Sequence, residues 1–169
     1  MKPSRPEGRV KASKPMIKQV PLSVMDYDKR DMRTQFAALC FRIVKDQPQI
    51  LMITSRRSHR WIIPKGWPMG AKTPGECALT EAWEEAGVQG KVYDRCLGVF
   101  SYHKVFGPKD GAPCLAMVYP VKVKALAGKF PEQGQRRRKW MTPNKAAQKV
   151  IEPELAHILR NFDPRMVKG

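Results

Sequence analysis

Four glutamates fall within ten positions of this chain, at Glu76, Glu81, Glu84 and Glu85. The 169 residues include only fifteen acidic ones, so this concentration needs a reason. On a helix, Glu81 would lie one turn from Glu85 and nearly one turn from Glu84, and each like-charge pair costs roughly 0.2–0.5 kcal/mol. Mg²⁺ or Mn²⁺ would relieve this crowding, because both cations prefer oxygen ligands and bridge to phosphates. The segment is therefore either a divalent metal site or a solvated acidic helix face, and taken alone the motif favours the solvated face.

The elements around these glutamates begin with a helix that has unusually complete end signals. Thr73 is a suitable N-cap, Pro74 occupies the first helical position, and Glu76 completes a capping box. Gly87 is placed to end the helix in the left-handed conformation. Apolar residues at helical spacing predict the face that packs against a sheet: Leu79, Ala82, Trp83 and Ala86. The opposite face is then expected to carry Thr80, Glu81, Glu84 and Glu85.

The rest of the chain predicts strands on both sides of this helix. Apolar and β-branched runs predict strands at 35–44, 49–54, 61–63, 92–102, 114–123 and 140–141. Residues 65–70 and 106–113 contain Pro and Gly and are expected to be loops. Two closing helices are predicted at 143–150 and 153–162. This order favours an α/β fold with a mixed sheet between helical layers.

The composition predicts one domain with a basic arm. Residues 1–30 contain four prolines among scattered basic residues, which favours a mobile arm. Residues 31–163 are expected to form the domain, and residues 164–169 a C-terminal tail. Because there is no apolar run of eighteen residues and no secretory signal, we expect a cytoplasmic protein without a membrane partner.

The net charge of +17 predicts a polyanionic partner, such as a nucleic acid, a nucleotide or a polyphosphate. Charge alone does not choose among these. The four cysteines have no paired short spacing, which argues against a zinc site or a thiol redox motif.

The region around the glutamates resembles the Nudix box. Gly66 precedes Thr80 by fourteen residues, and the segment from Thr80 to Val88 reads TEAWEEAGV. The box has Gly, five residues, Glu, seven residues, and then Arg-Glu-apolar-x-Glu-Glu-x-Gly-apolar. Together with the segment Arg60–Gly66, this is similar to the diphosphoinositol and diadenosine polyphosphate hydrolase branch of the family. The resemblance covers roughly residues 33–162 and implies a Nudix-type α/β/α sandwich.

Carried over by position, the resemblance assigns metal binding and water activation to Glu81, Glu84 and Glu85. Gly66 would lend its backbone carbonyl to the same Mg²⁺ or Mn²⁺ cluster. Which glutamate acts as the general base stays open. Two box positions depart from the pattern, because Lys72 stands in place of the first box glutamate and Thr80 in place of the box arginine. Lys72 is either a phosphate contact or a solvated loop lysine.

Cleaving a polyphosphate also requires cations around the phosphates, with arginine favoured for bidentate contacts. The candidates include Lys65, Lys72 beside the metal loop, and the run Arg136-Arg137-Arg138. By similarity to the inositol pyrophosphate branch, five residues match phosphate-binding positions: Arg33, Ser55, Arg56, Lys104 and Arg137. For each residue singly, a solvated surface group is the alternative.

The leading hypothesis is a metal-dependent pyrophosphohydrolase of a highly anionic small molecule, either an inositol pyrophosphate or a dinucleoside polyphosphate. A metal-activated water would attack one phosphorus. A second hypothesis is removal of pyrophosphate from the 5′-triphosphate end of RNA, with the basic segments along the backbone. A third is a sensor that binds a phosphorylated ligand without cleaving it.

Overall fold

The computed structural model describes residues 33–105 and 111–167 of the chain. The expected basic arm, residues 1–30, lies outside the described residues, as do residues 168–169 of the expected tail. The remaining part of that tail, Pro164–Val167, forms a short 3₁₀ helix, η3, whose Val167 is buried. Within the described part, no helix has the length and apolar character needed to cross a membrane.

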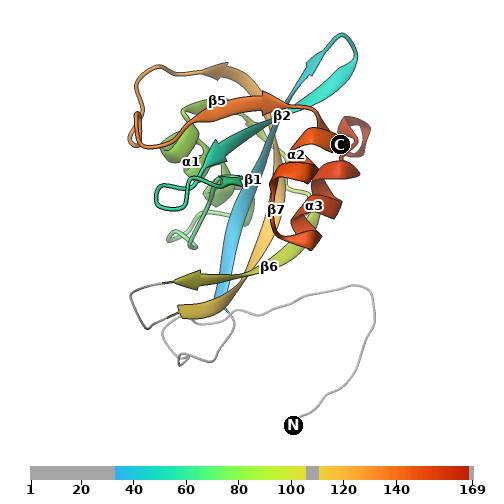
Figure 1. Ribbon diagram of the computed structural model, residues 1–169. Helices are drawn as coiled ribbons and strands as arrows, with labels where there is room; N and C mark the ends of the chain where they lie inside the picture. Colours follow the sequence, from blue (N-terminus) through green and yellow to red (C-terminus); the bar gives the residue numbers. More distant parts are fainter. Residues whose placement is uncertain (1–32, 106–110, 168–169) are drawn as a thin grey trace.

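The centre of the molecule is one mixed sheet of eight strands (Figure 1). Its strands are β1 (Arg33–Val44), β2 (Gln47–Thr54), β3 (Trp61–Ile62), β4 (Lys65–Gly66), β5 (Val88–Val92), β6 (Gly98–Val105), β7 (Gly111–Leu126) and β8 (Arg138–Met141). The main order is β3-β2-β1-β7-β5, while β4 pairs with β1, β6 with β7 and β8 with β2. Only β1 and β7 pair in parallel among the described strand pairs, which confirms the expected mixed sheet.

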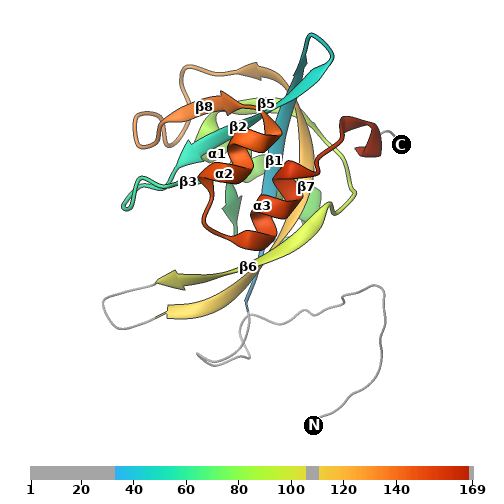
Figure 2. The ribbon, with the colours of Figure 1, turned by 45° about the vertical axis from the view of Figure 1, so that its right-hand side comes forward.

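Helices cover both faces of the sheet. Helix α1 (Pro74–Ala86) packs Ala78, Ala82 and Ala86 against one face. Helices α2 (Pro143–Lys149) and α3 (Pro153–Arg160) pack on the other face, around Phe41 and Leu39. Figure 2 shows α2 and α3 in front of the sheet and α1 behind it. The three layers confirm the expected α/β arrangement.

Lys65–Gly66 corrects one sequence expectation, because this pair forms a strand rather than loop. β2 pairs with β1 only from Phe41 to Val44, so the first half of β1 has a free edge on that side. β4 fills this edge, with Gly66 opposite Phe36 and Lys65 opposite Ala37. The pairing fixes the position of Gly66 beside the start of β1.

The expected single strand at 92–102 is also wrong, because β5 ends at Val92 and β6 begins only at Gly98. β5 pairs with the second half of β7 and β6 with the first half, along the same edge of β7. The chain leaves the sheet between Val92 and Gly98 and bonds to β7 at either end of this break, through Tyr93 N to Pro120 O and Leu97 N to Val118 O. β7 is correspondingly longer than expected and includes residues 111–113.

Candidate functional site

Helix α1 begins and ends as the sequence predicts. The Thr73 hydroxyl accepts a hydrogen bond from the Glu76 N–H at 3.1 Å, and the Glu76 carboxylate accepts one from the Thr73 N–H at 2.8 Å. Gly87 adopts φ 69° and ψ 25°, the left-handed conformation that glycine accepts without strain. These contacts fix the start and the end of the helix that carries the glutamates.

The orientation of α1 differs from the expectation. Glu81 and Glu85 are only 8% exposed, whereas Leu79 and Trp83 are half-buried. The buried face is made of small residues, including Ala78 and Ala82, together with the two carboxylates. Large apolar side chains therefore do not mark the most buried face of this helix; the small ones do, because they let the helix approach the sheet closely.

Gly66 lies directly against Glu81. A Cβ atom at Gly66 would lie 2.1 Å from Glu81 Oε2 and 2.7 Å from Oε1, well inside van der Waals contact. The absence of a side chain at this position is thus what lets the Glu81 carboxylate lie against β4. The structure therefore brings together Gly66 and Glu81, two of the residues predicted from the box.

Burial and mutual repulsion set the charge state of the carboxylate pair. Burial, and next the neighbouring Glu85 carboxylate, raise the pKa of Glu81 to about 8. Burial likewise raises the pKa of Glu85, against the lowering effects of Arg136 and Lys65. In the absence of a cation, these shifts favour the protonated form of at least one of the two carboxyl groups.

Arg136 and Glu132 lie beside this pair; the sequence offered Arg136 only as one of a run of possible phosphate contacts, and it did not mark Glu132. Arg136 Nη2 lies 3.9 Å from Glu85 Oε2, and Arg136 Nε donates to Glu132 Oε1 at 3.0 Å. The Glu132 N–H also donates to the Glu84 carbonyl at 3.0 Å. The sequence showed only a basic run from 136 to 139. No local pattern in this run predicts which arginine packs against the buried carboxylates.

The donor set fits a hard divalent cation. Glu81, Glu84, Glu85 and the backbone of Gly66 offer only oxygen atoms, the ligand type that Mg²⁺ and Mn²⁺ prefer. Among residues 33–105 and 111–167, no three side chains of the ligating types gather closely enough to hold an ion by themselves. Mg²⁺ is commonly held by one or two carboxylates and completes its shell with water and substrate phosphate. The site therefore fits an ion that binds together with its substrate.

Lys72 and Thr80 keep the loop attached to the helix. Lys72 Nζ donates a hydrogen bond to Thr80 Oγ1 at 2.8 Å, and Thr80 Oγ1 donates to the Glu76 carbonyl at 2.9 Å. The two departures from the box pattern therefore contact each other, and a charge-assisted hydrogen bond stands where the box has an ion pair.

Three of the predicted phosphate-binding cations converge near the start of β1. Cys114 on β7 pairs with Arg33 of β1 on one side and with Tyr102 of β6 on the other. Lys65 Nζ lies 4.9 Å from the centroid of the Tyr102 ring. Burial raises the pKa of Cys114, while the Tyr102 hydroxyl and the nearby cations Lys104, Arg33 and Lys65 lower it. Arg33, Lys65 and Lys104 thus form one group, which we call the cation group.

The other predicted phosphate contacts lie apart from the cation group. Arg56 Nη1 donates to Gln135 Oε1 at 3.2 Å, and the Arg137 guanidinium lies 5.3 Å from the centroid of the Trp61 ring. The Ser55 hydroxyl shares a 2.5 Å hydrogen bond with Ser58. These residues lie around the end of β2, where the Arg137 N–H donates to Thr54 Oγ1. Their contacts give them structural partners in the described part of the chain.

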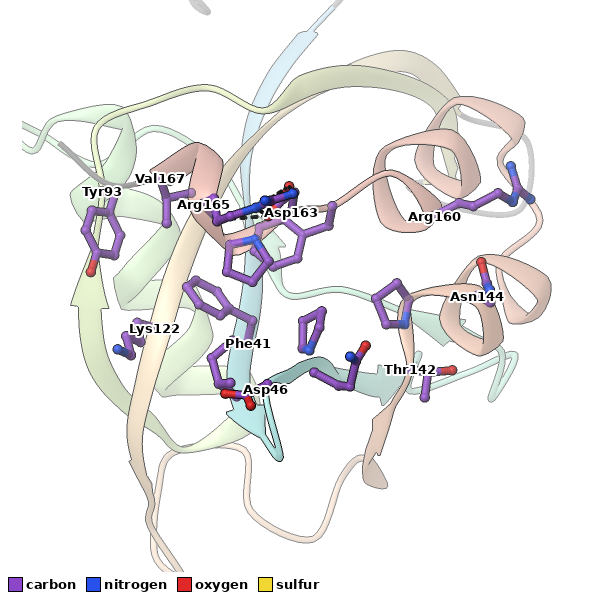
Figure 3. Close-up of a pocket in the computed structure, with 16 residues that line it drawn as sticks. Phe41, Asp46, Tyr93, Lys122, Thr142, Asn144, Arg160, Asp163, Arg165 and Val167 are labelled. Atoms are coloured by element: carbon purple, nitrogen blue, oxygen red, sulfur yellow. Dashed lines mark hydrogen bonds and ion pairs between the residues drawn. The ribbon is translucent and has the colours of Figure 1, made fainter.

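A large concavity lies at the far end of the sheet (Figure 3). It has a volume of about 1010 Å³ and lies between the β1–β2 turn, α2 and the C-terminal η3. Phe41, Phe162 and three prolines line it, with Asp163 and Arg165 paired at 2.7 Å on one side. No glutamate of α1 and no member of the cation group lines this space. We call it the far pocket.

Three comparisons with known proteins agree with this geometry. The NUDIX domain family model matches residues 33–162. Diphosphoinositol polyphosphate phosphohydrolase 2 of Homo sapiens is 38% identical over 85 residues, which are 50% of this chain and 47% of that protein. Nudix hydrolase 13, mitochondrial, of Arabidopsis thaliana is 29% identical over 140 residues, 72% of this chain and 69% of that protein.

The solved structures that match include an Ap4A hydrolase of C. elegans, at a TM-score of 0.57 and 16% identity over 77% of this chain and 95% of that one. This likeness shows the fold. The chain spans about half the length of the diphosphoinositol polyphosphate phosphohydrolases that it matches. Because the family model covers more than half of the chain and the box residues meet at one place in the fold, the chain belongs to the Nudix family of hydrolases.

Proposed function

We propose that this chain is a metal-dependent pyrophosphohydrolase that cleaves a phosphoanhydride bond in a highly anionic small molecule. The observation that carries the proposal is the buried Glu81–Glu85 pair, packed against Gly66 and adjacent to Lys65. Two buried carboxylates in contact are unfavourable unless a proton or a cation joins them. A polyphosphate-bound cation is the partner that this arrangement suits.

The names of the relatives support the class of substrate. Proteins that match are named diphosphoinositol polyphosphate phosphohydrolases, and a structure of similar fold is named an Ap4A hydrolase. Both names describe compounds with linked phosphates. The net charge of +17 and the cation group suit such polyanions.

The residues divide into two roles. Glu81, Glu84, Glu85 and the Gly66 carbonyl would hold Mg²⁺ or Mn²⁺. When bound, such an ion would polarise a phosphoryl oxygen and lower the pKa of the attacking water. The cation group would hold the phosphates that the ion leaves uncovered, and Lys65 links this group to the carboxylates, since its backbone N–H donates to Glu85 Oε1 at 3.4 Å.

A sensor that binds without cleaving is less well supported. Such a protein would need the cation group but not three glutamates on one helix. The Lys72–Thr80 hydrogen bond also keeps the loop of Gly66 attached to α1 despite the two box departures. The apparatus for hydrolysis is therefore retained along with the apparatus for binding.

The test is phosphate release from a panel of inositol pyrophosphates, dinucleoside polyphosphates, nucleotide sugars and 5′-triphosphate RNA, with and without Mg²⁺ or Mn²⁺. We expect metal-dependent release that Glu84→Gln and Glu85→Gln each reduce about a hundredfold or more, as when a central electrostatic group is lost. Glu154→Gln, on the exposed side of α3, is the matched control and should keep wild-type activity. Ligand binding without turnover of any compound would contradict the proposal and favour the sensor.

A further inference from the structure

The far pocket has an apolar floor that takes no part in the chemistry of the Nudix box. The rings of Phe41 and Phe162 pack together, with 4.9 Å between their centroids, and both residues are buried. Ile43, which lines the pocket, and Met166, in η3 between two lining residues, are each 42% exposed. Exposed apolar side chains gathered around a concavity are typical of an interaction surface. The far pocket is therefore a candidate binding groove.

Cations without an acidic partner lie toward both ends of this groove. Figure 3 shows Lys122 and Tyr93 toward one end and Arg160 toward the other. The side chains of Lys122 and Arg160 make no hydrogen bond or ion pair with any residue that the structure describes. A ligand that fills the groove along its length therefore meets positive charge at each end.

A second lysine adds to the positive charge near Lys122. Lys91 of β5 is the register partner of Lys122 of β7, so both side chains project from the same face of the sheet. Lys91 Nζ also lies 5.1 Å from the centroid of the Tyr93 ring, and Tyr93 lines the groove. Like charges directly opposite each other on neighbouring strands are destabilising. A carboxylate between the two ammonium groups relieves this repulsion.

The acidic residues of the groove leave this positive charge largely unbalanced. Asp163 already binds Arg165 at 2.7 Å, so the charges of these two residues offset each other. Asp46, in the β1–β2 turn, is the other acid among the lining residues. Beside this one acid there are three cations without an acidic partner: Lys91, Lys122 and Arg160. The electrostatic complement of the groove is therefore a ligand with acidic groups.

The floor of the groove favours a peptide over a nucleic acid. Proteins bind unpaired bases by stacking them on exposed aromatic faces. Phe41 and Phe162 are at most 7% exposed, and Lys91 lies over one face of the Tyr93 ring. The groove therefore offers little aromatic surface for stacking, whereas aliphatic side chains fit its apolar floor. The chain's own residues 1–32 contain more basic than acidic groups, so they do not match the charge of the groove.

We propose that the far pocket is a docking groove for a peptide segment of a partner protein, in which acidic residues flank a short apolar run. The apolar side chains lie over Phe41 and beside Ile43. The acidic groups pair with Lys91 and Lys122 at one end and with Arg160 at the other. The groove is lined by neither the glutamates of α1 nor the cation group, so this interaction does not depend on the proposed hydrolysis.

Selection from a phage library of random dodecapeptides on the immobilised full-length chain tests this proposal. The enriched peptides are then synthesised with a fluorescent label, and their dissociation constants are measured by anisotropy. We expect enrichment of peptides that carry Asp or Glu on both sides of Leu, Ile, Met or Phe. Their binding should weaken as salt rises, and Asn or Gln in place of the acids should weaken it about tenfold or more.

Two exposed positions of the groove provide the variants. Lys122→Glu and Ile43→Asp should each weaken binding about tenfold or more, because the first reverses a charge and the second places a charge on the apolar wall. Lys129→Glu is the matched control, since it makes the same charge reversal at an exposed position outside the groove, and it should keep wild-type affinity. Circular dichroism checks that each variant is folded.

Absence of enrichment, enrichment of neutral or basic peptides, or equal binding by the wild type and either groove variant would overturn the proposal. A single-stranded RNA of twelve nucleotides provides the competing arm of the test. If this RNA binds the wild type but not Lys122→Glu, and displaces the peptides, the groove belongs to a nucleic acid and the proposal is wrong.

Discussion

The carboxylates at the two ends of the sheet are in opposite situations. Near the start of β1, Glu81 and Glu85 are buried against each other, and burial raises the pKa of both. In the far pocket, hydrogen bonds from Arg165 to both oxygens of Asp163 lower the pKa of that carboxyl (Figure 3). The two carboxylates of the first pair share one arginine, Arg136, at 3.9 Å from Glu85, whereas Asp163 has Arg165 to itself at 2.7 Å.

This contrast teaches that the chemistry of the lining groups, rather than volume, locates the site. The far pocket has ample volume, but of the two carboxylates that line it, Asp46 and Asp163, the second already has an arginine partner, Arg165. The site at α1 has two buried carboxylates whose negative charge is only partly balanced, and it lies next to the cation group. Substitutions in the Glu81–Glu85 pair should therefore reduce hydrolysis strongly. Equivalent substitutions in the far pocket should not.

The largest effect should come from Glu81→Gln. We expect it to reduce metal-dependent hydrolysis about a hundredfold or more. The same change should raise the melting temperature of the metal-free protein at neutral pH, because the unfolded chain then no longer gains free energy by ionising Glu81, whose pKa burial raises to about 8 in the folded state. Asp163→Asn is the matched control and should leave activity unchanged. Phosphate release measures the activity of each variant, and thermal melting measures its stability. Loss of activity with Asp163→Asn, or full activity of Glu81→Gln, would contradict the comparison.

A smaller but clear loss should follow Gly66→Ala. The added Cβ meets the Glu81 carboxylate, which must move away from β4. Because that carboxylate ends a flexible side chain, we expect activity to fall about tenfold or more while the melting temperature changes little. Gly128→Ala is the control, since nothing lies within 4 Å of its added Cβ. Metal titration of both variants should show weaker binding only for Gly66→Ala, and equal metal affinity would contradict the close approach.

The smallest effect should appear at Lys72 and Thr80. Their hydrogen bond is exposed, so each single change to the usual box residue, Lys72→Glu or Thr80→Arg, should alter kcat/KM by no more than about fivefold, within the range of surface pairs. The double change restores an ion pair and should return kcat/KM to the wild-type value. A double-mutant cycle measures the coupling. If the effects simply add, Lys72 and Thr80 do not act as a pair.

The sequence predicted α1 in detail because its signals are local. Thr73, Pro74, Glu76 and Gly87 lie where the capping rules require, and each makes the expected contact or conformation. The orientation of the helix was not predicted, because hydrophobic periodicity gave weight to Leu79 and Trp83. The close approach of α1 to β4 depends instead on small residues and on Gly66, and it became visible only in three dimensions.

Features that depend on distant parts of the chain could not be predicted. β4 exists because β2 leaves part of the edge of β1 free, which no pattern in residues 65–70 reveals. Arg136 and Glu132 reach the site from the segment after β7, through turns whose paths the sequence does not specify. Of the seven predicted phosphate contacts, the structure gathers three into the cation group: Arg33, Lys65 and Lys104. The others lie at the end of β2 or beside Thr80.

The central claim is that the Glu81–Glu85 pair holds a divalent cation, and manganese diffraction tests it most directly. Crystals soaked in Mn²⁺ with a non-hydrolysable polyphosphate would be measured at the manganese absorption edge. We expect an anomalous peak about 2.1 Å from carboxylate oxygens of α1 and from the Gly66 carbonyl, with phosphate completing the shell. A peak only in the far pocket, or none beside Glu81, would contradict the account.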